Sequence, residues 1–137
     1  MTLLCFLKRF FFDIEKDSVG EIETDGVRCP DHLYDDTALA YKSEKGLFII
    51  TGCSHSGIGN ICQQAKKVCG EDKIYGIIGG FHLFEDDEKL AYTVDYFVKN
   101  GIEKLYPCHC VSLAAKHRMM EKLAVNEVGV SLVLEIE

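Results

Sequence analysis

Three of the five histidines follow directly after apolar segments and lie in short turns. They are His55 in TGCSHSG (51–57), His82 in GGFHL (79–83) and His109 in PCHC (107–110). Imidazole and the thiolate of a neighbouring cysteine are ligands that hold zinc and other borderline metal ions in proteins. One such histidine alone is more often a hydrogen-bonded residue of a turn. Its repetition in three successive turns favours one shared site for a metal ion or a substrate.

The segments around these turns read as alternating strands and helices. Gly70 is placed to end the first helix, Asp86 and Asp87 to begin the second, and Ser112 to begin the third. Right-handed crossovers bring the carboxyl ends of parallel strands to one edge of a sheet, where α/β proteins bind their ligands. We therefore expect the three histidines to meet there. The expected strands lie at 47–50, 74–78 and 102–106, and the expected helices at 58–69, 90–98 and 113–124.

The chain divides at Gly46. Residues 1–45 are irregular, with strand-like stretches at 2–14, a turn-rich loop at 15–36 and a short strand at 37–41. Residues 46–137 predict an α/β half-domain of order β-α-β-α-β-α-β. Fully apolar strands joined by helices indicate a largely parallel sheet that is covered on both faces. The last strand, 128–136, alternates strictly between apolar and polar residues, which is typical of a strand at or near a sheet edge.

The seven cysteines are interpreted as reduced thiols of a cytoplasmic protein, because no signal peptide precedes them. Cys53 stands two residues before His55 and is expected to reach the site. Cys108 and Cys110 flank His109. In an extended strand these two cysteines would share one face and the histidine would occupy the other.

The turn after the first apolar strand also has an anion-binding interpretation. Ser54, Ser56 and Gly57 precede a helix, so hydroxyls and free backbone N–H groups there could hold a phosphate or a carboxylate. Gly80, in the next turn, lets a substrate approach the backbone closely. The sequence lacks the glycine-rich patterns of nucleotide-binding loops and the Gly-x-Ser-x-Gly pattern of serine hydrolases, so neither class is supported.

The composition is that of a single globular domain. The chain has 137 residues, of which 47% are apolar, and only two prolines, which argues against a disordered or fibrous protein. Its formal net charge of −7 disfavours nucleic acid as a partner, because an acidic surface repels the phosphate backbone. The apolar stretch at 1–12 is too short to cross a bilayer, so no membrane partner is expected.

The three turns together resemble a known family. TGCSHSGI followed by Asn60, then GGFHL, then PCHC, in this order, closely resemble the second half of hydrolases with the metallo-β-lactamase fold. The pattern DDxAL (35–39) is similar to a subgroup of β-lactamase superfamily II that includes dihydropterin ribofuranosylaminobenzene phosphate synthases. The resemblance covers about residues 20–137.

The resemblance implies an αββα sandwich with a site for one or two divalent metal ions, zinc foremost, with iron or manganese as alternatives. It implies that His109 is a metal ligand and that His55 and Cys53 are ligands or near neighbours. It also implies that His82 acts catalytically at the substrate. The reaction implied is metal-dependent hydrolysis of a small, phosphorylated or pterin-like molecule.

The motif His-x-His-x-Asp-His that defines this family does not occur in the sequence. The resemblance therefore implies the C-terminal half of the fold, with an incomplete metal site and no efficient hydrolysis by this chain alone. We expect either a part of a longer protein or a natural short protein that joins a homo- or hetero-oligomer. The alternatives are a non-enzymatic α/β module that binds an anion or a metal ion, and a subunit that completes the fold of a partner.

Overall fold

The computed structural model describes residues 2–6, 14, 18–33 and 35–136. The strands and helices expected within 46–120 are confirmed in kind and order, and the strand expected at 37–41 is β4. Of the stretch expected at 2–14, the part from 7 to 13 lies outside the described residues. The elements are β1 (Thr2–Phe6), β2 (Gly20–Thr24), β3 (Val27–Asp31), β4 (Thr37–Ser43), β5 (Gly46–Thr51), α1 (Ile58–Cys69), β6 (Ile74–Gly79), α2 (Glu88–Lys99), β7 (Lys104–Pro107) and α3 (Leu113–Met120).

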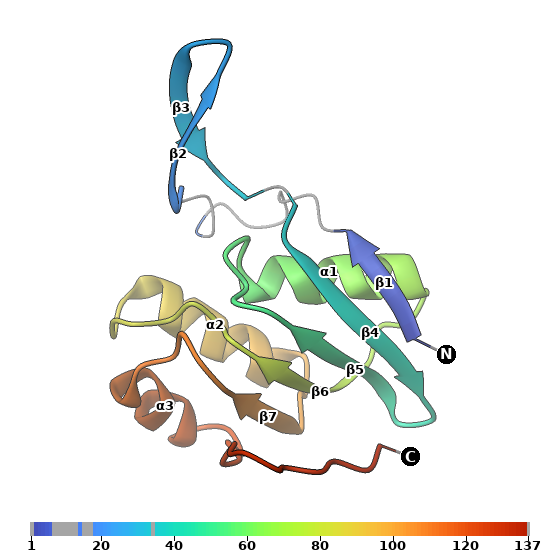
Figure 1. Cartoon of the computed structure of the whole chain (residues 1–137). Coiled ribbons are helices and arrows are strands. Elements are labelled where there is room, and N and C mark those ends of the chain that lie inside the picture. The colour runs from blue at the N-terminus through green and yellow to red at the C-terminus, as the bar shows by residue number, and fades with distance from the viewer. Residues whose placement is uncertain (1, 7–13, 15–17, 34, 137) are drawn as a thin grey trace.

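A mixed five-stranded sheet in the order β1-β4-β5-β6-β7 forms the centre of the molecule (Figure 1). β4 pairs antiparallel with both β1 and β5. β4 and β5 are joined by a tight turn, at which Ser43 pairs with Gly46. β6 pairs parallel with β5 and with β7. The three strands that precede the histidine turns are therefore parallel, as expected, and the antiparallel pairs extend the sheet on one side.

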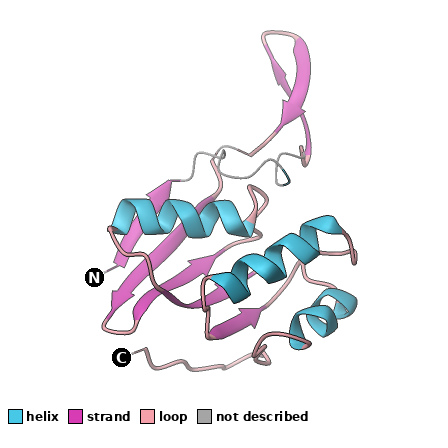
Figure 2. Ribbon diagram, turned by 180° about the vertical axis from the view of Figure 1, so that it is seen from behind, coloured by secondary structure: helices cyan, strands magenta, loops and turns pink. Residues whose placement is uncertain are grey.

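The helices α1 and α2 both lie on one face of this sheet (Figure 2). The chain moves in one direction from β5 to β6 to β7, so two right-handed crossovers place their helices on the same side. Neither helix covers the opposite face, where Ile50 is 43% exposed. The expectation of a sheet covered on both faces is therefore wrong at this position. The core between sheet and helices includes Leu47, Ile49, Ile61, Ile77, Leu90 and Phe97.

The helix ends follow local signals in the sequence. α1 ends at Gly70, which has a left-handed φ of 59°. Asp87 and Ser112 begin α2 and α3, where their side chains accept hydrogen bonds from the N–H groups of Leu90 (2.9 Å) and Ala115 (3.0 Å). These caps fix the points at which the histidine turns become helices. In the described part of the chain, no helix is both long and apolar enough to cross a bilayer.

The strand expected at 128–136 is wrong, because the described chain there is extended or turning without strand pairing. Val125 forms a single β-bridge to Leu105 of β7, and the chain then leaves the sheet. Val130 and Val133 are largely exposed, at 101% and 80%. Alternating apolar residues form a strand only where a neighbouring strand and an apolar face are available. Here the described residues supply neither.

The third helix also buries a different face from the apolar face that the sequence predicts. Leu113 and Met120 are 84% and 54% exposed, and His117, expected in the core or at its boundary, is exposed. Ala115 and Met119 are buried in their place. The helix ends at Met120, whereas the periodic pattern in the sequence predicts a helix as far as residue 124.

A two-stranded hairpin of β2 and β3 projects from the sheet (Figure 1). Its turn residues Asp25 and Gly26 both have positive φ, 52° and 76°, as a tight hairpin turn of this twist requires. The sequence predicts only a turn-rich loop for this segment. The strands were missed because the side chains on both faces are mostly exposed, so they show no apolar alternation.

Candidate functional site

The turns that follow β5, β6 and β7 are joined by backbone hydrogen bonds at one edge of the sheet. The N–H of Gly80 donates to Gly52 O at 2.7 Å, and the N–H of Cys108 donates to Gly79 O at 2.8 Å. The N–H of Leu83 donates to Cys110 O at 2.9 Å. The parallel strands thus bring all three histidine turns into contact.

Cys53, His109 and Cys110 form the strongest candidate for a metal site within the described residues. The Cys53 Sγ lies 3.2 Å from the His109 Nε2, and the potential ligand atoms of the three side chains all lie within 4.8 Å of one another. Burial raises the pKa of the Cys110 thiol, and a hydrogen bond with Cys53 raises it further. Two thiols and an imidazole are a donor set that suits zinc.

Gly80 allows the cluster of Cys53, His109 and Cys110 to form. A Cβ on Gly80 would lie 2.9 Å from the Nε2 of His109 and 2.9 Å from its backbone oxygen. Only a residue without a side chain fits between the imidazole and the turn after β5. The close approach expected at Gly80 is thus made by His109.

Cys110 was not selected as a ligand from the sequence, and the alternation argument for Cys108 and Cys110 does not apply. β7 ends at Pro107, and Cys110 has a left-handed φ of 55°, which turns it toward Cys53. The Cys108 thiol instead donates to Tyr106 O at 3.4 Å. The signal that could have identified Cys110 is its position directly after His109 in a turn.

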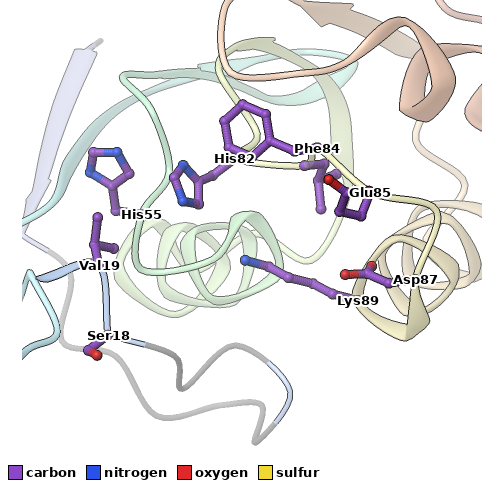
Figure 3. Close-up of a pocket in the computed structure, with 9 residues that line it drawn as sticks. Ser18, Val19, His55, His82, Phe84, Glu85, Asp87 and Lys89 are labelled. Carbon is purple, nitrogen blue, oxygen red and sulfur yellow. The ribbon is translucent and has the colours of Figure 1, made fainter.

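His55 and His82 lie in a second part of the site, beside a pocket of about 190 Å³ (Figure 3). Their rings meet edge to face with centroids 4.7 Å apart, and Phe84 contacts His82 in the same way at 5.1 Å. Lys89 from the first turn of α2 lines the pocket, as do Ser18 and Val19 before β2. The three-donor cluster does not include His55.

His82 has two unfavourable features. Its φ is +51°, and its buried Nδ1 has no hydrogen-bond partner among the described residues. Burial lowers the pKa of His82, the charges of Lys89 and His55 lower it further, and Asp36 opposes them. A neutral imidazole with one unsatisfied nitrogen in a pocket wall is suited to exchange a proton with a ligand.

The hydroxyls of the first turn hold groups of the protein itself. Ser54 is fully buried, and its Oγ donates to Gly80 O at 2.6 Å. The N–H and the Oγ–H of Ser56 both donate to the Asp36 Oδ2, at 2.9 and 2.8 Å. Gly57, with a φ of 93°, donates its N–H to Ser54 O. The Asp36 carboxylate thus occupies the position before α1 at which an anion was expected, so an external anion there would have to displace it.

We expect Asp36→Ala to lower the free energy of unfolding by about 1–3 kcal/mol, because it leaves two buried donors of Ser56 unpaired. Urea denaturation followed by circular dichroism measures this change. Asp35→Ala is the matched control, since Asp35 is exposed. Equal stability of the two variants would contradict the role of Asp36.

The chain is similar in sequence to two curated proteins. No protein-family profile matches the chain. It is 39% identical over 110 residues to a 7,8-dihydropterin-6-methyl-4-(beta-D-ribofuranosyl)-aminobenzene-5'-phosphate synthase of Methanocaldococcus jannaschii, covering 79% of this chain and 37% of the synthase. It is also 39% identical over 98 residues to an uncharacterized protein of the same organism, covering 71% of this chain and 35% of that protein.

Among solved structures, the chain is similar to Tm1679, a metal-dependent hydrolase of the beta-lactamase superfamily. The TM-score is 0.82 at 28% identity, over 98% of this chain and 53% of that one. The chain thus spans about half the length of the solved structure and little more than a third of the curated relatives. In fold, and at 28% sequence identity, the chain is similar to a metal-dependent hydrolase of the β-lactamase superfamily.

Proposed function

We propose that this chain forms part of a metal-dependent hydrolase and supplies Cys53, His109 and Cys110 as ligands for one divalent metal ion, with zinc as the preferred ion. The observation that supports this most is the 4.8 Å cluster of two thiols and an imidazole at the carboxyl ends of the parallel strands. Three donors leave a fourth position of a tetrahedral zinc site for another ligand. The substrate proposed is a small, phosphorylated or pterin-like molecule, in keeping with the synthase to which the chain is similar.

A metal ion held by these residues supplies Lewis-acid activation of water or of a substrate oxygen. The residues of the chain then have distinct tasks. Cys53 and Cys110 must lose their protons before they bind a metal ion, so metal affinity falls as the pH is lowered. His82, whose pKa is lowered by burial, exchanges a proton at the pocket. His55 contacts His82 and orients its ring. We also propose His55 as a further ligand of a metal ion.

Titration with cobalt(II) tests the proposed ligands, because thiolate ligation gives a charge-transfer band in the near ultraviolet. We expect micromolar or weaker binding by the chain alone. His109→Ala should weaken it at least tenfold, since even groups that only support a ligand contribute roughly 10–100-fold. Cys110→Ser should reduce the band, whereas Cys29→Ser on the hairpin should not. An unchanged titration in His109→Ala would reject the site, and nanomolar binding would mean that further ligands exist.

A second candidate function is the completion of another chain's fold. It is favoured by the sheet face that neither α1 nor α2 covers and by the 53% of the solved relative that the chain spans. Gel filtration with the remaining half of such a protein would show a stable complex if this function is correct. A module that binds an external anion next to Ser56 is less well supported, because the Asp36 carboxylate occupies that position.

A further inference from the structure

The pocket beside His82 contains a cation that has no counter-ion in the part of the chain that the structure describes. Lys89 is half-buried at the start of α2, and no carboxylate of the described residues lies within salt-bridge distance of it. Its ammonium is turned toward the His82 side of the pocket and away from the Asp87 carboxylate (Figure 3). Several other cations of the described chain, among them Lys73, Arg118 and Lys122, have acidic partners.

Two of the three acidic residues at 85–87 have other partners. The Asp87 carboxylate accepts the N–H of Leu90 at 2.9 Å as the cap of α2. Asp86 lies 3.8 Å from the Arg118 Nε, and Glu85 is exposed at the rim. Within the described residues, the charge of Lys89 is therefore not neutralised by a direct pair, and an anion that enters the pocket can pair with this ammonium.

The size and the walls of the pocket restrict the anion. Its volume of about 190 Å³ is close to the roughly 150 Å³ that holds one benzene molecule in an engineered cavity. A single phosphoryl group fits inside. Phe84 stands at the rim with 49% exposure and offers its ring to a planar group that remains outside.

We propose that this pocket binds the phosphate of a phosphate monoester, with Lys89 pairing the phosphoryl oxygens and Phe84 contacting an aromatic or planar group that bears the ester. This inference rests on the proposed function, because it assigns a substrate class to the pocket beside the metal ligands. It adds a binding residue, Lys89, and a residue that selects esters over free phosphate, Phe84. Neither lies in a turn that contains the proposed metal ligands Cys53, His109 and Cys110.

Calorimetric titration of the EDTA-treated chain with inorganic phosphate and with phenyl phosphate tests the proposal. We expect Lys89→Gln to weaken both about tenfold, as the loss of one charge-assisted contact predicts. Lys99→Gln at the exposed end of the same helix removes the same charge and should leave both unchanged. Equal effects of the two lysine variants, or no effect of Lys89→Gln, would overturn the site.

Phe84→Ala should weaken the binding of phenyl phosphate severalfold and leave that of inorganic phosphate unchanged. Equal affinities for the two probes in the original chain would overturn the assignment of a monoester. The metal proposal is judged separately by the cobalt titration of Cys53, His109 and Cys110. Loss of the lysine effect with an intact cobalt band would reject this inference alone, and the reverse result would reject the metal site alone.

Discussion

Gly79→Ala should destabilise the chain by more than about 4 kcal/mol, which is beyond the range of ordinary single substitutions. A Cβ at this position would lie 2.3 Å from Thr51 O and 2.5 Å from the Thr51 Cγ2, and backbone atoms cannot yield as a flexible side chain can. Gly79 also has a φ of +145°, which residues with a side chain rarely adopt. Because Gly79 O accepts the N–H of Cys108, the substitution would separate β5, β6 and β7 at the edge that bears the site.

Gly101→Ala is the control that isolates the backbone effect. Gly101 has a left-handed φ of +60°, but a Cβ there would have no atom within 4 Å. Its replacement should lower the free energy of unfolding by only about 1–2 kcal/mol, the usual effect of a left-handed residue with a Cβ. Urea denaturation of both variants compares them directly. Similar stabilities would show that the contact with Thr51 is relieved by movement of the sheet.

Phe81→Ala should lower the free energy of unfolding by about 3–5 kcal/mol, as large-to-small substitutions of buried aromatic residues do. Phe81 is fully buried, and its ring meets that of Phe97 edge to face at 5.8 Å. It anchors the turn after β6 to α2 and so holds the neighbouring His82 at the pocket. Thermal and urea unfolding both measure the loss.

The matched control lies three residues further along the same turn. Phe84 is 49% exposed, so Phe84→Ala should change the free energy of unfolding by less than about 1 kcal/mol. The two substitutions remove the same side chain from the same loop and differ in burial. A loss for Phe84→Ala as large as that for Phe81→Ala would contradict the assignment of Phe81 to the core.

The parts of the fold that local signals determine could be predicted from the sequence. Gly70, Asp87 and Ser112 mark helix ends through the conformation or the hydrogen bonds of one residue, and all three act as expected. The meeting of His55 and His82 follows from their positions after parallel strands. Both inferences need only periodicity and the handedness of crossovers.

The remaining features depend on contacts that no local pattern reveals. Asp36 reaches Ser56 from β4's side of the sheet, 20 residues earlier in the chain, and no spacing rule indicates that pair. Cys110 joins the cluster through a left-handed turn that alternation along a strand cannot anticipate. The segment 128–136 has the periodicity of a strand, but strand formation also needs a neighbour, and periodicity says nothing of one.

The contact between Cys53 and His109 closes a loop of 56 residues that spans two crossovers, whereas β4 and β5 meet through a tight turn. The entropy lost on closing a loop increases with its length, so the hairpin can form early and the site only once the whole parallel sheet is in place. A metal ion bound to both side chains would therefore act as a crosslink between the first and last parallel strands. It would slow the separation of β7 from β5, so that metal occupancy would set the lifetime of the folded chain as well as its chemistry.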